Sequence, residues 1–196
     1  MIEFPWKLVE DKTLIESNSW MMAALMDKGI PLKYVKEPDK DTIKRLHTIF
    51  QCLNSNRNFI LIVSNKTAYI NSLFYYVAAT WLTTTNRNFE IIDLNNVVED
   101  DTILFKMEHA NLLIIPYNDS ENYKLRNIRN ALGSILLKRQ IKSVPTIIEL
   151  YVKQPPKGMP NKDLVGLLKN LANLYGEQCA STFIEKESNV KLLVLG

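Results

Sequence analysis

Residues 59–82 have the order of elements in which proteins bind phosphate: a buried strand, a polar loop and a helix. Residues 59–63 are continuously apolar and rich in β-branched side chains, which is typical of a parallel strand covered on both faces. A polar stretch at residues 64–71 separates this strand from an apolar helix expected over residues 72–82. This context predicts a phosphate-binding loop at residues 64–71.

The groups that grip phosphate are missing from that loop. In the motif G-x-x-x-x-G-K-[ST], counted without gaps from the strand, the glycines fall on Ser64 and Tyr69, the Lys on Ile70 and the hydroxyl on Asn71. Cβ atoms then crowd a loop whose backbone N–H groups must surround phosphate. Without the Lys and the Mg²⁺ ligand, nothing neutralises the charge that develops during phosphoryl transfer. We expect a phosphate-loop fold that has lost its nucleotide site.

The composition predicts a globular cytoplasmic protein. The chain has 196 residues, 46% of them apolar, which suits one domain, or one domain with a small appendage. Cys52 and Cys179 stand outside any ligand-spaced cluster, so we expect reduced, packed thiols and no metal site. The first residues lack the pattern of a signal peptide, and no apolar run reaches the roughly 20 residues of a membrane span. No membrane association is expected.

Strand and helix patterns alternate along residues 39–196. Strands are expected at residues 59–63, 89–93, 111–115, 144–148, 182–184 and 190–195. Helices are expected at residues 39–54, 72–82, 95–105, 121–140 and 161–174, and Asp41 is expected to cap the first or to oppose its dipole. Such alternation implies right-handed βαβ units and a mainly parallel sheet. The predicted fold class is therefore α/β, a three-layer sandwich with a mainly parallel sheet flanked by helices.

Residues 1–38 are expected to form an N-terminal helical extension to a domain of residues 39–196. Residues 20–26 have helical character and are followed by Gly29 and Pro31, which end helices. Their Met and Trp side chains suit a core, or alternatively an adaptable docking surface. The candidate partner-binding residues are Trp6, Trp20, Met21 and Met22.

Positive charge is concentrated in residues 121–170, which hold ten Lys and Arg residues against three acidic residues. A solvated helix face accounts for such a bias, and binding of single-stranded DNA is the alternative. The candidate phosphate contacts are basic residues expected to point mostly outward from helix 121–140: Lys124, Arg126, Arg129, Lys138 and Arg139.

The order of elements resembles AAA+ ATPases that act as bacterial replicative-helicase loaders, of the DnaC and DnaI type, and the related IstB-type ATPases. Residues 30–34 resemble the family's I-P-x-x-[YF] segment, and residues 111–115 resemble its L-L-I-I-D-D motif. Residues 144–148 are similar to its R-x-P-T-I-I-T-[ST]-N sensor strand, and residues 174–182 to its L-G-x-x-x-x-S-R stretch. The resemblance covers residues 30–196 and implies a P-loop NTPase fold of the AAA+ kind.

The resemblance also implies where further nucleotide-binding groups would lie, and this chain replaces them. Pro116 and Tyr117 stand where the family has two acidic residues, and Thr182 stands where it has an Arg that reaches a neighbour's nucleotide. The sensor Asn falls at residues 149–151, where no Asn occurs. We therefore expect no catalysis and no bound cofactor.

Two compensating arrangements would restore a site. Lys66 and Thr67 form a K-T pair four positions too early, which would start the helix too soon. Asp119 is a carboxylate for a metal, but it lies beyond Pro116 and away from the strand end. Either would make the chain an active ATPase with a divergent site.

The resemblance implies a non-catalytic, helicase-loader-like pseudo-ATPase that acts by protein–protein interaction in DNA replication or mobile-element maintenance. The expected partner is a replicative helicase, a helicase loader or a related ATPase. Residues 1–38 are the expected docking region, because the segment before the core engages the helicase in that family. The alternatives are a single-stranded DNA-binding accessory protein with weak DNA affinity, or a structural pseudo-ATPase subunit of a larger complex.

Overall fold

One parallel sheet organises the part of the chain that the structure describes. This computed structural model describes residues 19–55, 58–64, 67–94, 101–117, 123–151, 161–183 and 190–195. Five strands pair in the order β2-β3-β4-β1-β5, and every pair is parallel. The strands are β1 (Phe59–Ser64), β2 (Phe89–Ile91), β3 (Leu112–Ile115), β4 (Thr146–Tyr151) and β5 (Val190–Leu195). The predicted α/β class is confirmed.

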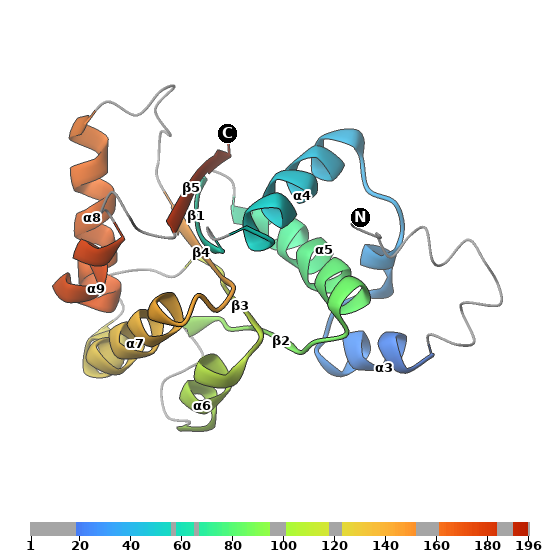
Figure 1. Ribbon diagram of the computed structural model, residues 1–196, viewed down its shortest axis with the longest axis horizontal. Coiled ribbons are helices and arrows are strands. Elements are labelled where there is room, and N and C mark those ends of the chain that lie inside the picture. The colour runs from blue at the N-terminus through green and yellow to red at the C-terminus, as the bar shows by residue number, and fades with distance from the viewer. Residues whose placement is uncertain are drawn as a thin grey trace.

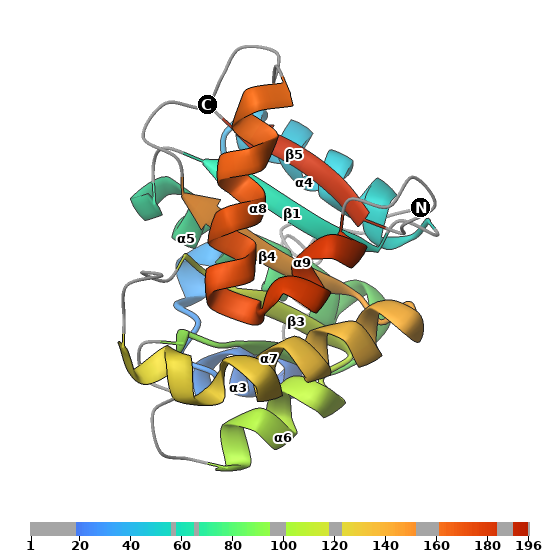
Figure 2. The same cartoon turned by 90° about the vertical axis from the view of Figure 1, so that its left-hand side faces the viewer.

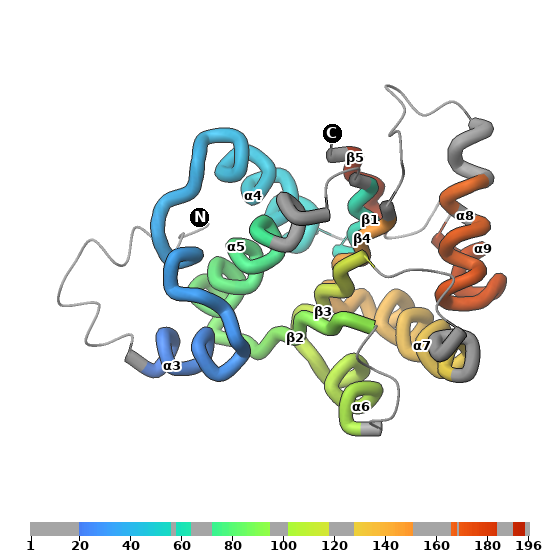
Figure 3. Tube along the Cα trace, turned by 180° about the vertical axis from the view of Figure 1, so that it is seen from behind, coloured from blue at the N-terminus to red at the C-terminus, as the bar shows by residue number. Residues whose placement is uncertain are grey.

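Helices cover both faces of this sheet (Figure 1). One layer holds α3 (Ser19–Asp27), the short 3₁₀ helix η1 (Leu32–Val35), α4 (Lys40–Leu53) and α5 (Thr67–Thr85). The opposite layer holds α6 (Asp101–His109), α7 (Tyr123–Ile141), α8 (Asn161–Tyr175) and α9 (Glu177–Thr182). Figure 2 shows α7, α8 and α9 lying across the strands. Figure 3 shows the molecule from behind, opposite to the view of Figure 1. The arrangement is the predicted three-layer sandwich.

The continuous apolar strands arise because both faces of the sheet are buried. Along β1, Ile60 and Ile62 pack into the core beneath α4 and α5, whereas Phe59, Leu61 and Val63 pack beneath α7 and α8. All five side chains are at most 3% exposed. Successive side chains of the strand point to opposite faces of the sheet, so they pack into two separate cores. Because both faces are buried, neither face of β1 needs polar residues.

Residues 19–35 are integral to the first of these cores. Met21, Leu25, Ile30 and Tyr34 are buried in the same apolar cluster as α4 and α5. Gly29 adopts a left-handed φ of +69° at the end of α3, which turns the chain back towards the sheet. The proposed division at residue 38 stays a prediction, but residues 19–35 share their core with the domain that follows.

Two predicted helix starts differ from the structure. Asp39, rather than Asp41, caps α4: its carboxylate accepts the N–H groups of Asp41 at 3.0 Å and Thr42 at 2.9 Å. These contacts lower the pKa of Asp39. Helix α5 begins at Thr67, five residues earlier than predicted, with consequences for the phosphate site described below.

The strand expected at residues 182–184 is wrong. Thr182 is the last residue of α9, and Phe183 ends that helix. The Phe183 ring lies 5.0 Å from the ring of Phe59, centroid to centroid, so it packs onto the sheet rather than extending it. A short apolar run can be either a strand or the end of a helix that packs over a core. Here it is the end of a helix.

Candidate functional site

Helix α5 begins close to the end of β1. β1 ends at Ser64 and α5 begins at Thr67. Tyr69, Ile70 and Asn71 therefore lie within α5, whereas the sequence predicted a loop over residues 64–71. The motif wraps phosphate with backbone N–H groups of both glycines and the four residues between them. The loss of the nucleotide site stays a prediction.

The start of α5 also bears on the alternative K-T pair. Thr67 is the first residue of the helix, so the helix does start as early as that alternative requires. Lys66 and Asp119 lie outside the described residues, and the structure gives no contact for either.

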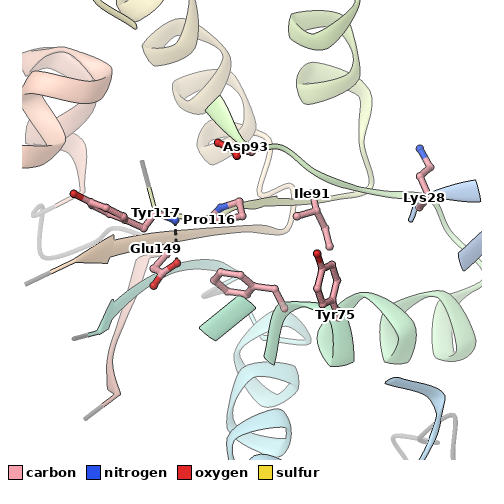
Figure 4. A pocket seen from close by; sticks show the side chains of 8 residues that line it. Lys28, Tyr75, Ile91, Asp93, Pro116, Tyr117 and Glu149 are labelled. Atoms are coloured by element: carbon pink, nitrogen blue, oxygen red, sulfur yellow. Dashed lines mark hydrogen bonds between the residues drawn. The ribbon is translucent and has the colours of Figure 1, made fainter. Parts of the chain in front are cut away.

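A pocket of about 400 Å³ lies at the carboxyl ends of β2, β3 and β4, beside α5 (Figure 4). Ligands of parallel α/β sheets bind at this edge. Its lining combines aromatic, apolar and charged side chains from five elements and their flanking turns: Lys28, Phe74, Tyr75, Ile91, Asp93, Pro116, Tyr117 and Glu149. Pro116 and Tyr117, the predicted degenerate acidic motif, thus do lie at a pocket.

Glu149 is the buried charge of this pocket. It lies in β4 opposite Ile62 of β1 and is only 2% exposed. Its Oε2 accepts the main-chain N–H of Tyr117 at 2.9 Å (Figure 4). Asp93, just after β2, is an exposed carboxylate of the same lining. Two carboxylates therefore line this edge of the sheet.

The positive charge in the pocket lining is already engaged. Lys28 Nζ lies 2.5 Å from Glu90 Oε1, and this ion pair is partly solvent-exposed. The lining of the pocket thus includes one ammonium and two carboxylates.

Sequence reasoning missed most of this pocket. Lys28, Tyr75 and Asp93 come from separate elements, and no motif unites them. Glu149 carried a signal, because it is the one charged residue in an otherwise apolar or hydroxyl-bearing strand, residues 146–151. A charge in a strand buried on both faces indicates a special local environment.

Arg139 does not point outward, contrary to the prediction for helix α7. It is 1% exposed and its guanidinium donates to the start of β4 and the end of α6. The acceptors are Thr146 Oγ1 at 2.9 Å, Met107 O at 2.9 Å, Ala110 O at 2.7 Å and Pro145 O at 2.7 Å. Burial lowers the pKa of Arg139 to about 10, so it remains charged at neutral pH. A DNA-binding role for this residue is therefore wrong.

The other basic candidates do not form a continuous outward face among the described side chains. Lys138 Nζ lies 3.0 Å from Glu108 Oε1, and Arg129 is half-buried. Lys124 and Arg126 belong to α7, but their side chains lie outside the described part. Binding of single-stranded DNA stays an untested prediction.

The partner-binding candidates also include both exposed and buried side chains. Trp20 is 46% exposed and Met22 is half-buried, but Met21 is buried and its Sδ accepts a contact from the Thr83 hydroxyl at 3.2 Å. Met21 is therefore a core residue, and the prediction of a surface role for it is wrong. Trp6 lies outside the described residues.

The sheet order and the two helical layers define a three-layer α/β fold with a parallel sheet. One solved structure that the chain resembles is the crystal structure of the DnaC helicase loader, with a TM-score of 0.56. The alignment covers 82% of this chain and 93% of that chain at 16% sequence identity. At this identity the likeness establishes the fold, and it confirms the resemblance drawn from the sequence. No protein-family model and no curated protein matches the sequence.

The described residues show neither a membrane-spanning helix nor a cluster of metal ligands. None of their helices has the length and apolarity needed to cross a membrane. They contain no group of three or more His, Cys, Asp or Glu side chains arranged to hold a metal ion.

Proposed function

We propose that this protein is a non-catalytic, helicase-loader-like pseudo-ATPase that acts in the cytoplasm by binding another protein during DNA replication or mobile-element maintenance. The observation that carries the proposal is the two-residue connection between β1 and α5. Phosphate-loop chemistry depends on backbone N–H groups that converge on the nucleotide, and so short a link does not supply them. A protein of this fold that binds no nucleotide can still act by binding other proteins through its surface.

The chemistry of the carboxyl edge supports the same conclusion. Glu149 is buried in the wall of the pocket, and Asp93 also lines it. Pro116 and Tyr117 follow β3, where the family resemblance implies acidic metal ligands. A triphosphate placed here would meet negative charge and no metal ligand from β3.

The proposed partner is a replicative helicase, a helicase loader or a related ATPase. The support is the likeness in fold to DnaC, which is a helicase loader. Trp20 and Met26 are 46% and 62% exposed on α3, the first described helix of the expected docking region. Exposed aromatic and Met side chains are typical of protein-binding surfaces.

Thermal unfolding in the presence of nucleotide tests the loss of the site. We expect no change of the unfolding midpoint with millimolar ATP and Mg²⁺. A ligand present at a hundred times its Kd would stabilise the protein by about 2.7 kcal/mol, which such a measurement detects readily. A clear shift with ATP–Mg²⁺ contradicts the proposal.

Affinity capture from the native host, with the full chain as bait, tests the partner. We expect retention of a replicative helicase or loader, and a marked loss of retention for Trp20→Ala. Phe105→Ala is the matched control, because Phe105 is an exposed aromatic residue, 64% accessible, on α6 across the sheet. Undiminished capture by Trp20→Ala would remove α3 from the docking surface.

A further inference from the structure

We propose that the outer edge of β5, the edge that faces away from β1, binds an extended segment of a partner protein. The segment adds a further strand to the sheet and carries a carboxylate opposite Lys191. The inference goes beyond the proposed function, because this edge is a second surface, separate from α3. Three features of β5 support it: its place at the end of the sheet, its apolar composition and its unpaired charge.

β5 is the outermost strand on its side of the sheet (Figure 2). It pairs with β1 in parallel, from Phe59 opposite Val190 to Ser64 opposite Leu195. Among the described residues, no hydrogen bond joins the outer edge of β5 to a second segment. The main-chain N–H and C=O groups along such an edge have the spacing that another extended chain matches. The edge is therefore suited to strand addition, a common way in which proteins bind extended peptides.

The other edge of the sheet, formed by β2, is protected in ways that β5 is not. β2 has only three residues, and its central residue is Glu90, whose carboxylate pairs with Lys28. Short strands and charged side chains are features by which proteins prevent unwanted pairing at sheet edges. β5 has six residues, five of them apolar. The edge that favours pairing is therefore the one formed by β5.

The side chains of β5 are less buried than those of its neighbour. From Phe59 to Val63, the side chains of β1 are at most 3% exposed. Along β5, Leu192 and Leu193 are only partly buried, and Val194 is 44% exposed. Leu192 packs against the core beneath α7 and α8, and Leu193 packs against the core beneath α4 and α5. An added strand would cover apolar surface on both faces of the sheet, which stabilises association.

Lys191 determines which segment fits the edge. It is the single charged residue of β5, it is half-buried, and it forms no ion pair within the described part of the chain. Antiparallel pairing of β5 with a second copy of itself, centred on Leu192 or Leu193, would place Lys191 opposite a leucine of that copy. A carboxylate directly opposite Lys191 forms a favourable cross-strand pair instead. Charge complementarity therefore favours a partner segment with an acidic residue over a second copy.

Titration of the isotopically labelled full chain with acetyl-Thr-Val-Glu-Val-Thr-Val-Thr amide, the Glu peptide, tests the edge. We expect saturable changes in the amide chemical shifts of residues 190–195, while those of β2 stay unchanged. The same peptide with every backbone amide N-methylated should not bind, because it has lost the donors that pair with a strand. Absence of saturable binding by the Glu peptide, or equal binding of the N-methylated peptide, would overturn the inference.

Charge reversal then tests the role of Lys191. The Lys peptide, in which Lys replaces Glu, should bind the natural chain about fivefold more weakly than the Glu peptide. Lys191→Glu should reverse this preference, and Lys191→Gln should abolish it. The control is Lys142→Glu, which reverses an exposed charge just after α7 and should leave the preference unchanged. An unaltered preference in both Lys191 variants, or a reversal in the Lys142 variant, would contradict the assignment.

Sedimentation of the full chain distinguishes a partner segment from a second copy. We expect no dimer that the Glu peptide dissociates. A dimer that dissociates on addition of the Glu peptide would show that β5 pairs with itself, and the assignment to a partner protein would be wrong. Undiminished helicase capture by Trp20→Ala would leave the peptide result unaffected, so this inference and the proposed docking role of α3 fail separately.

Discussion

Arg139 and Glu149 are two buried charges at opposite ends of β4, and their surroundings differ. At the amino end of the strand, the guanidinium of Arg139 donates hydrogen bonds to Thr146 Oγ1 and to the Pro145 carbonyl. Glu149 lies towards the carboxyl end and forms part of a pocket wall. Their exposed fractions, 1% and 2%, are almost equal. Burial alone therefore does not distinguish a charge enclosed by other protein groups from one that lines a pocket.

The largest expected effect is that of removing Arg139. Arg139→Met removes the guanidinium donor from the carbonyl groups of Met107 and Ala110, while the Pro145 carbonyl keeps the N–H of Leu113. We expect the free energy of unfolding, measured by urea denaturation, to fall by about 3 kcal/mol. Arg139→Lys keeps the charge but loses the planar fork, so it should recover only part of the loss. A loss below about 1 kcal/mol would mean that Arg139 is not a structural charge.

Gly133→Ala separates the packing of α7 from the hydrogen bonds of Arg139. A Cβ on Gly133 would lie 2.1 Å from the main-chain oxygen of Tyr175, so α7 and α8 would have to move apart. Overpacking of this kind costs about 1–3 kcal/mol. The control is Gly166→Ala in α8, where a Cβ meets nothing within 4 Å and should stabilise the helix by about 0.5–1 kcal/mol. Equal effects of the two substitutions on urea denaturation would contradict the close contact.

Glu149 should tolerate a neutral replacement better than Arg139 does. Glu149→Gln keeps an oxygen for the Tyr117 N–H and should cost less than about 1 kcal/mol. Glu149→Leu removes that acceptor and should cost about 1–2 kcal/mol. Urea denaturation of both variants measures the difference. If Gln were as costly as the Arg139→Met change, Glu149 would be a structural charge as well, and the contrast between the two ends of β4 would disappear.

The smallest expected effect concerns the exposed ion pair beside Arg139. The hydrogen bond from Lys138 lowers the pKa of Glu108 below its ordinary value of 4.5. A depressed carboxyl pKa contributes stability that is present above pH 4.5 and is lost as the pH falls through the lowered value. The stability difference between wild type and Glu108→Gln should therefore be present at pH 6, vanish in strong acid and shrink in high salt. A difference that is independent of pH would contradict the pair.

Much of the fold could be predicted because buried strands have a strong local signature. Residues 59–63, 111–115 and 190–195 are continuous apolar runs, and each is a strand or most of one. The start of α5 could not be predicted. The phosphate-loop pattern requires a long loop after β1, and residues 67–71 carry no Gly or Pro to show where a shorter loop ends.

The candidate site could be predicted only where it coincided with a known motif. Pro116 and Tyr117 were recognised because they follow a strand at the position of two acidic residues. The burial of Arg139 could not be predicted, because its carbonyl acceptors on and after α6 lie about 30 residues away in sequence. From the sequence alone, basic side chains at the end of a helix are expected to face solvent. Only the position of the neighbouring element in the folded chain shows that one of them is buried. The pocket depends on the same long-range placement, since Lys28 and Glu149 meet only in the folded chain.

The two-residue link between Ser64 and Thr67 has a consequence for regulation. In nucleotide-driven switches, a segment is ordered by contacts with the γ-phosphate and its Mg²⁺ and is released after hydrolysis. A protein without a nucleotide site would have no such control. Under the proposed function, its association with a partner would ignore the energy status of the cell and follow its own abundance, so that synthesis and degradation would switch it on and off.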